Sequence, residues 1–230
     1  MLHPANLHSS PAAIPMPRAG CRLSSACVLV AMLALHMPAA GCTVPNHFVR
    51  AYRVARTTPS SRAKISIVLD ALEYAPTMKS DTEAVGVKKN GFNRIVAKLY
   101  TRTGAATWLT NAFTAELDMA GIRLQRDEAL GAEAPHLRII VTQFFVEPSF
   151  GFFMAELQAV TIADVEVSFP DNGAKYTRRF VGRDISTEYA ATDRLIERRL
   201  LLSCQKALAL AAEEIAKLVE DHQTQGQARP

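Results

Sequence analysis

The sequence predicts an α+β domain, in which an antiparallel or mixed sheet of about five strands carries one mid-chain helix and one long C-terminal helix on one face. Segments whose apolar residues alternate at period two are joined by short turns, which favours strands that pair with their neighbours in sequence. Only two segments have helical spacing, too few for a series of βαβ units. The content of 49% apolar and 21% charged residues is typical of a globular domain.

The first half of this domain is expected to hold a strand, a hairpin and a helix. Period-two alternation places strands at residues 64–72, 85–87 and 95–100. Asn90 and Gly91 mark the turn of the hairpin, because both residue types tolerate positive φ. Helical spacing follows over residues 105–120, with Gly121 at the C-cap position. Trp108 lies on the apolar stripe of this helix, so we expect a core residue rather than a ligand-stacking platform.

The second half is expected to hold three strands and the long helix. The strands are predicted at residues 137–147, 157–169 and 175–185. Asp171-Asn172-Gly173 joins the last two of them, which predicts an antiparallel hairpin. A helix is expected over residues 190–220, and Cys204 lies on its apolar side, where it is expected to be a small buried hydrophobe.

The predicted hairpin carries paired charges. Asp164 and Glu166 share one face of its first strand, and Arg179 and Arg183 lie within reach on its second. Cross-strand ion pairing is the simpler interpretation, and acid–base chemistry is the alternative.

Catalytic and metal-binding patterns are missing from the sequence. It contains no Gly-rich phosphate loop, no Gly-x-Ser-x-Gly elbow and no His-Glu-x-x-His pair. His47 falls in the predicted tether, His136 opens a predicted strand and His222 falls in the predicted tail, so no two of them are expected to share a metal ion. We therefore expect a protein that is not an enzyme, with no catalytic residue, no metal site and no cofactor.

The N-terminal 41 residues have the composition of a secretory signal peptide. They contain no Asp or Glu, and Arg18 and Arg22 precede an apolar run over residues 27–35. That run is too short to span a bilayer, which needs roughly 20 apolar residues. Either Met1 or Met16 serves as the start of this signal.

The residues before Cys42 bear on how the signal peptide is removed. Ala39-Ala40-Gly41-Cys42 resembles the lipobox of bacterial lipoproteins, although that motif usually has Leu where this chain has Ala39. The resemblance implies a lipid-modified Cys42, attached to the membrane through an N-terminal diacylglycerol. The alternative is ordinary cleavage after a small-x-small site, which leaves Cys42 unmodified.

The expected organisation is a signal peptide over residues 1–41, a lipidated flexible tether over 42–62, a single domain over 63–220 and a disordered tail over 221–230. The tether carries four arginines that are expected to be solvated: Arg50, Arg53, Arg56 and Arg62. Without the signal peptide, 24 basic residues face 22 acidic ones, a net charge of +2 with no dense basic stripe. This balance argues against nucleic acid as a partner.

An aromatic cluster surrounds the connection between two predicted strands. Its members are Phe144, Phe145, Phe150, Phe152 and Phe153. They are candidates for a surface that binds a ligand or a partner. The alternative is that they plug the end of the sheet.

Taken together, several segments resemble the YajG-like family of uncharacterised Gram-negative lipoproteins. The resemblance covers roughly residues 64–220 and rests on Val-Gly-Val-Lys-Lys-Asn-Gly-Phe at 85–92, the helix end at 115–122, the strand at 137–145 and the closing Ala-rich helix. It implies no catalytic residues and an acylated cysteine at Cys42. Thr43 stands where inner-membrane retention would require Asp, which implies an outer-membrane address facing the periplasm.

The predicted function is that of a non-enzymatic outer-membrane lipoprotein, a periplasm-facing binding or scaffold module of the envelope-assembly or transport-auxiliary type. Its expected partners are the membrane, through the lipid on Cys42, and an envelope protein. The alternative is a carrier of lipid or of another hydrophobic ligand that uses the aromatic cluster around Phe150.

Overall fold

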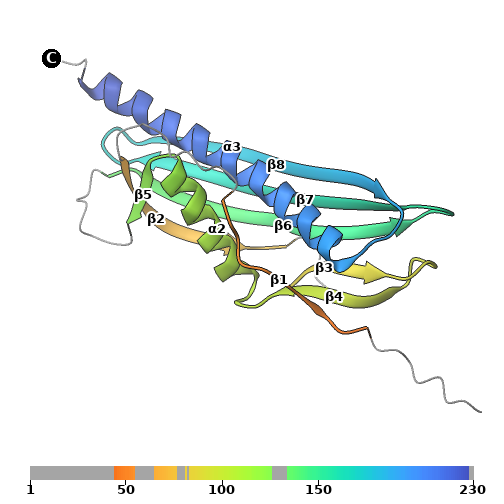
Figure 1. The fold of residues 1–230 in the computed structure, drawn as a ribbon. Helices are drawn as coiled ribbons and strands as arrows, with labels where there is room; N and C mark the ends of the chain where they lie inside the picture. The colour runs from red at the N-terminus through yellow and green to blue at the C-terminus, as the bar shows by residue number, and fades with distance from the viewer. Residues whose placement is uncertain (1–43, 55–64, 77–80, 82, 126–133, 228–230) are drawn as a thin grey trace, which may run out of the picture. The chain divides into compact units, whose positions relative to one another are not determined.

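The computed structural model describes residues 44–54, 65–76, 81, 83–125 and 134–227. The chain divides into two compact units, residues 1–42 and 43–230, and every described residue belongs to the second. The described residues form one mixed sheet of eight strands with two helices on one face (Figure 1). The predicted α+β class with a mid-chain and a long C-terminal helix is confirmed. The predicted number of about five strands is wrong, because the sheet has eight.

The elements follow one another along the chain with these bounds: β1 (His47–Val49), β2 (Ile65–Tyr74), β3 (Ala84–Lys89), β4 (Ile95–Thr101), α2 (Ala105–Met119), β5 (Ile122–Gln125), β6 (His136–Phe150), β7 (Ala155–Phe169), β8 (Ala174–Glu188) and α3 (Asp193–Gln227). Each predicted strand is present and most are longer than expected. The two strands that were not predicted, β1 and β5, have three and four residues. Segments this short do not reveal a period.

The sheet is mixed because β6 pairs with strands of both directions. Its strand order is β1-β4-β3-β6-β2-β5, and β7 and then β8 continue from the other edge of β6. β2 runs parallel to the first half of β6, and β3 pairs with it in parallel further along, at Gly86 and Val146. β7 is antiparallel to β6 over nearly its whole length. The chain between β4 and β5 crosses over through α2, which returns β5 parallel to β2.

The helices pack on the same face of this sheet and share one core (Figure 1). α2 ends at Met119 and its C-cap is Ala120 rather than the predicted Gly121. Gly121 directly follows the cap, and its φ of 86° is the left-handed conformation that favours glycine there. α3 contributes Leu200, Cys204, Leu208 and Ile215, all essentially inaccessible to solvent. Cys204 is thus the buried small hydrophobe that the sequence predicted, and burial, followed by the nearby charge of Glu116, raises the pKa of its thiol.

Buried polar groups fix α3 to β7 and β8. Thr161 Oγ1 and Ser203 Oγ lie 3.0 Å apart inside the core. Asp184 of β8 accepts hydrogen bonds from Arg199 at 3.1 Å and from Lys206 at 2.6 Å. Because a carboxylate with two cationic partners is costly to separate from either, these contacts set the helix in one register on the sheet.

The predicted disordered tail over residues 221–230 is wrong for most of its length, and residues 228–230 lie outside the described residues. α3 continues to Gln227, so residues 221–227 are helical rather than disordered. The ring of His222 stacks on Phe169 with centroids 3.9 Å apart, and its Nε2 lies 2.8 Å from a carboxylate oxygen of Asp171. These contacts hold the last turns of α3 against the β7–β8 turn. They join positions that are distant in the sequence, so the polar composition of residues 221–227 does not predict them.

Part of the predicted tether belongs to the fold. The N-terminal segment, residues 44–54, forms β1 and pairs in parallel with β4. Val49 is almost fully buried, and the carbonyl oxygen of Arg50 accepts a hydrogen bond from Trp108 Nε1 at 2.8 Å. The expectation of a free tether is therefore wrong for these residues. The remaining parts of residues 42–62 lie outside the described residues.

Candidate functional site

The predicted lipidation site, Cys42, lies outside the described residues. Val44, the first described residue, is only two positions further on. Because a chain spans at most about 3.6 Å per residue, Cys42 can be no more than about 7 Å from Val44.

The five phenylalanines of the predicted aromatic cluster do not form one surface. Successive residues of a strand point to opposite faces of the sheet. Phe144 therefore points into the core, where it is fully buried and stacks on Trp108 with ring centroids 5.0 Å apart. Phe145 points to the opposite face and is half-buried. Phe144 is thus a core residue, and the suggested surface role is wrong for it.

The other three phenylalanines lie where β6 ends and turns into β7. Phe150 is half-buried, and its backbone N–H and C=O bond to the side chain of Asn93 at 2.7 and 3.0 Å. Phe152 and Phe153 are 92% and 80% exposed, with rings edge to face at 4.5 Å. The alternative that the cluster plugs the end of the sheet therefore does not hold for these two rings.

The charges of the β7–β8 hairpin form ion pairs, as predicted. Arg179 donates from two nitrogens to both carboxylate oxygens of Asp164, at 2.7 and 2.8 Å. These hydrogen bonds hold the pKa of Asp164 below its ordinary value. Glu166 pairs at 2.8 Å with Lys175 and not with Arg183. Asp164 is therefore held in the ionised form by Arg179, which does not suit a general acid or base near neutral pH.

A pocket of about 260 Å³ lies on the face of the sheet away from the helices. It is lined by Tyr74, Pro76, Asp81, Ala84, Val87, Ile95, Lys98, Thr142, Gln143, Phe144, Phe145 and Glu147. Lys98 Nζ donates to Asp81 at 2.7 Å, and this hydrogen bond lowers the pKa of Asp81. Burial, reinforced by the charges of Glu83 and Asp81, raises the pKa of Tyr74 to about 12. The pocket is near the lower end of the volumes typical of small-molecule sites, and its charged groups are paired.

A larger groove, of about 640 Å³, runs between the N-terminal segment and α3. It is lined by Phe48, Arg50, Ala51, Tyr52, Arg53, Arg102, Arg198, Leu201, Leu202 and Gln205. We call it the arginine groove, because four arginines from three separate regions of the chain meet there. Arg53, Arg102 and Arg198 are exposed and have no ion-pair partner within the part of the chain that the structure describes. Unpaired guanidinium groups beside apolar side chains suit an acidic, partly apolar ligand.

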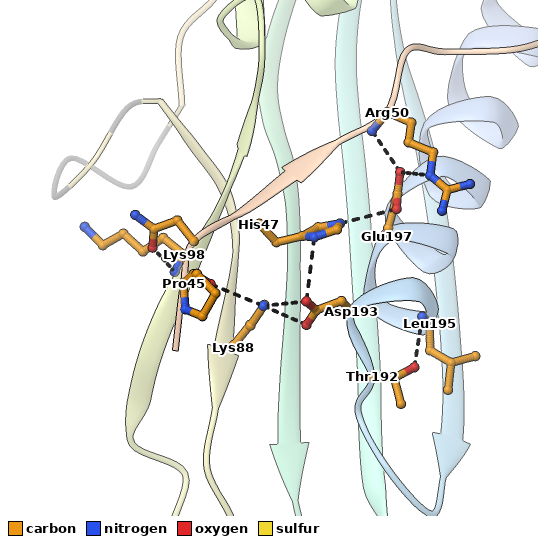
Figure 2. Close-up of polar contacts among 10 residues, drawn as sticks. Pro45, His47, Arg50, Lys88, Lys98, Thr192, Asp193, Leu195 and Glu197 are labelled. Carbon is orange, nitrogen blue, oxygen red and sulfur yellow. Dashed lines mark hydrogen bonds and ion pairs between the residues drawn. The ribbon is translucent and has the colours of Figure 1, made fainter. Parts of the chain in front are cut away.

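The groove depends on a cluster of polar contacts that joins the N-terminal segment to the start of α3. Figure 2 shows this N-terminal clamp, which consists of His47, Arg50, Lys88, Asp193 and Glu197. Glu197 is buried, and its carboxylate accepts the backbone N–H of Arg50 at 2.8 Å and lies 3.3 Å from His47 Nε2. Lys88, also buried, donates to Asp193 at 2.7 Å. Each charge in the clamp therefore has an opposite partner, which makes its role structural.

Removing the central carboxylate should release the N-terminal segment. We expect Glu197→Leu to speed amide hydrogen exchange over residues 46–52 and to cost about 1–3 kcal/mol of stability, because the Arg50 amide and His47 lose a buried acceptor. Glu197→Gln keeps an acceptor oxygen and should lose less. Exchange would be followed by mass spectrometry of peptic peptides, with circular dichroism to confirm folding. Equal exchange in the wild type and both variants would contradict this role of Glu197.

No group of three or more His, Cys, Asp or Glu residues lies close enough to hold a metal ion among the described residues. Within the same residues, neither helix is both long and apolar enough to cross a membrane.

Sequence reasoning missed both the groove and the clamp, because they are assembled from distant segments. Arg50 and Glu197 are 147 positions apart. The one feature of the sequence that could have pointed to the groove is the set of arginines in the predicted tether, because two of them, Arg50 and Arg53, line it.

Comparison with known proteins gives a likeness of structure only. No family model matches the sequence, and the search of curated proteins found no match. The chain is similar to the solved structure of a DUF330 protein from Xanthomonas campestris, with 16% identity, a TM-score of 0.49 and coverage of 80% of this chain and 99% of that one. It is also similar to PelC from Paraburkholderia phytofirmans, solved as a dodecamer, with 11% identity, a TM-score of 0.37 and coverage of 69% and 93%.

A lipoprotein from Neisseria meningitidis is a further solved structure to which the chain is similar. It has 11% identity and a TM-score of 0.33, and the match covers 68% of this chain and 99% of that one. The resemblance to the YajG-like lipoproteins stays a prediction.

Proposed function

We propose that this chain is a non-enzymatic lipoprotein of the outer membrane, held by a diacylglycerol on Cys42, whose periplasm-facing domain binds an acidic segment of an envelope protein in the arginine groove. The observation that carries the binding proposal is the meeting of four arginines on one groove in a chain whose mature net charge is only +2. Charge gathered at one place while the rest is balanced favours a specific anionic partner over general adhesion.

Apolar side chains in the groove narrow the class of partner. Leu201 and Leu202 of α3 are half-buried, and Phe48 is half exposed beside them. A free phosphate would leave these apolar surfaces unused. A peptide with acidic residues and one or two apolar anchors would use both kinds of contact.

The carrier alternative has less support. The five phenylalanines do not line one cavity, and only Phe144 and Phe145 border the pocket of about 260 Å³. The charged groups of that pocket are already satisfied by ion pairs, such as Lys98 with Asp81.

The lipid anchor is tested by the intact mass of the mature protein extracted from membranes. We expect a chain that begins at residue 42 and carries diacylglycerol or three acyl chains. Cys42→Ala should prevent this processing and move the domain out of the outer-membrane fraction. A wild-type mass without lipid, or unchanged fractionation of Cys42→Ala, would overturn the anchor.

The groove is tested by a photo-cross-linking side chain placed at Gln205 of the full-length protein in living cells. We expect one cross-linked adduct whose partner peptide, identified by mass spectrometry, is rich in Asp or Glu. Arg102→Glu with Arg198→Glu should abolish it. The matched control is Arg123→Glu with Lys217→Glu, which makes the same change of net charge at exposed positions that do not line the groove. Absence of the adduct, or its survival in the groove variant, would reject the proposal.

A further inference from the structure

The four most exposed large apolar side chains of the described residues lie at one end of the sheet. They are Phe92, Phe152, Phe153 and Tyr189, each at least 80% exposed. We call this group the aromatic tip. Other large apolar side chains in the described part of the chain are at most 59% exposed. Such a concentration of exposed rings at one place requires an occupant or an apolar environment.

Register and hydrogen bonds bring these residues to the same end. Phe92 lies in the β3–β4 turn, and Phe152 and Phe153 lie in the β6–β7 turn. Figure 1 shows these two turns at the same end of the sheet. The side chain of Asn93 bonds to both backbone groups of Phe150, which holds one turn beside the other. Tyr189 directly follows Glu188, the partner of Ala155 in the β7–β8 pairing.

The N-terminal segment enters the sheet from this same end. β4 begins next to the β3–β4 turn, and β1 runs parallel to it with His47 opposite Leu99. The side-chain oxygen of Asn46 accepts the backbone N–H of Lys98 at 3.1 Å. Counting back in register, Val44 lies level with Val96, only a few residues along β4 from the turn that carries Phe92.

The short stretch of chain between Cys42 and Val44 limits how far the aromatic tip can lie from the lipid. Cys42 is two residues before Val44, which allows about 7 Å of chain. A lipid attached there cannot lie far from the end of the sheet at which the N-terminal segment enters. The aromatic tip is therefore the part of the domain nearest to the bilayer that holds the lipid.

The composition of the tip suits the headgroup region of a membrane. The two turns, residues 90–94 and 151–154, contain three phenylalanines and Met154, and Arg94 is their single charged residue. Aromatic side chains partition into the interface between headgroups and acyl chains, and a lone arginine is tolerated there. Beside the two or three acyl chains of the proposed anchor, rings that insert at the interface add apolar contact with the bilayer and orient the domain on it.

We propose that the aromatic tip inserts into the interfacial layer of the bilayer that carries the lipid anchor, so that the domain stands on the membrane with the long β7–β8 hairpin directed away from it. This inference rests on the proposed lipidation of Cys42. The orientation leaves the arginine groove, on the side of the domain between the N-terminal segment and α3, facing the periplasm.

The test uses the lipidated full-length mature protein in vesicles of phosphatidylethanolamine and phosphatidylglycerol, with no other protein present. Spin labels are attached through Phe153→Cys at the tip or through Asn172→Cys in the β7–β8 turn. These positions lie about 50 Å apart, from a rise of about 3.3 Å per residue along β7. Cys204 is fully buried and does not react in the folded protein.

We expect the label at position 153 to lose its collisions with a water-soluble nickel complex and to gain collisions with oxygen, while the label at position 172 stays fully accessible to nickel. Phe152→Ser with Phe153→Ser should also speed transfer of the lipidated protein between vesicles by about 10-fold or more per ring removed. Circular dichroism should show that this doubly substituted protein is folded, since both replaced side chains are exposed. Equal nickel access at positions 153 and 172 in a lipidated protein would overturn the inference alone.

If the mature protein proves to carry no lipid, the proposed function fails. Membrane binding by the aromatic tip is then tested by sedimenting the unlipidated protein with the same vesicles. Binding that is lost in Phe152→Ser with Phe153→Ser would support the tip as a membrane contact. Absence of binding by the wild type would overturn it.

Discussion

Gly182→Val is expected to destabilise the domain by about 3–5 kcal/mol, which is most of the stability of a typical small domain. A Cβ atom at position 182 would lie 1.9 Å from the carbonyl oxygen of Ser203 and 2.8 Å from the backbone nitrogen of Ala207. Both atoms belong to the backbone of α3, so no flexible side chain can move aside. The helix would have to leave the sheet, and the burial of Leu200 and Leu208 would be lost with it.

Urea unfolding followed by circular dichroism measures this effect. Gly182→Ala should already show a large part of the loss. Gly91→Ala is the control, because Gly91 is exposed and nothing lies within 4 Å of its added Cβ. That variant should stay within about 0.5 kcal/mol of the wild type. An unfolding midpoint of Gly182→Val equal to that of Gly91→Ala would show that α3 does not pack on β8 as described.

Trp108→Ala is expected to cost about 3–5 kcal/mol, because it removes the largest side chain at the junction of α2, β6 and the N-terminal segment. Trp108 is 4% exposed, stacks on Phe144, and meets the edge of Tyr52 at a centroid distance of 5.6 Å. Its Nε1 also donates to the carbonyl oxygen of Arg50. Alanine would leave a cavity and an unmade hydrogen bond at the backbone of Arg50, a residue that lines the arginine groove.

Thermal and urea unfolding would be compared for Trp108→Ala, Trp108→Phe and Tyr189→Ala. Phenylalanine keeps the stacking but loses the N–H donor, so its cost should be smaller, about 1–2 kcal/mol. Tyr189 is 86% exposed, and its replacement should change stability by less than about 0.5 kcal/mol. If Trp108→Ala were as stable as Tyr189→Ala, the proposed core junction would be refuted.

Much of the fold could be predicted because its long elements repeat a local pattern. The β7–β8 hairpin follows from alternation on both sides of Asp171-Asn172-Gly173, and Gly173 indeed has a φ of 69°. The β3–β4 turn was also predicted correctly, although the positive φ falls on Asn93 rather than on Asn90 or Gly91. β1 was missed because its three residues are ordered by contacts with β4 and α3 rather than by their own pattern.

The residues of the candidate site could be predicted only where they are neighbours in the sequence. The sequence singled out Phe152 and Phe153 as candidates for a binding surface, with a plug at the end of the sheet as the alternative. It grouped them with Phe144, which the alternation of β6 directs into the core. The arginine groove gathers Arg53, Arg102 and Arg198 from three regions of the chain. No spacing rule relates such positions, since only tertiary structure brings them together.

The separation of the clamp residues along the chain also sets an order of events. His47 and Glu197 are 150 positions apart, so synthesis from the amino end delivers β1 long before the helix that fixes it. Closing so long a loop is among the later steps of folding. The arginine groove, whose N-terminal side these contacts hold in place, is therefore assembled only after the last helix has been made.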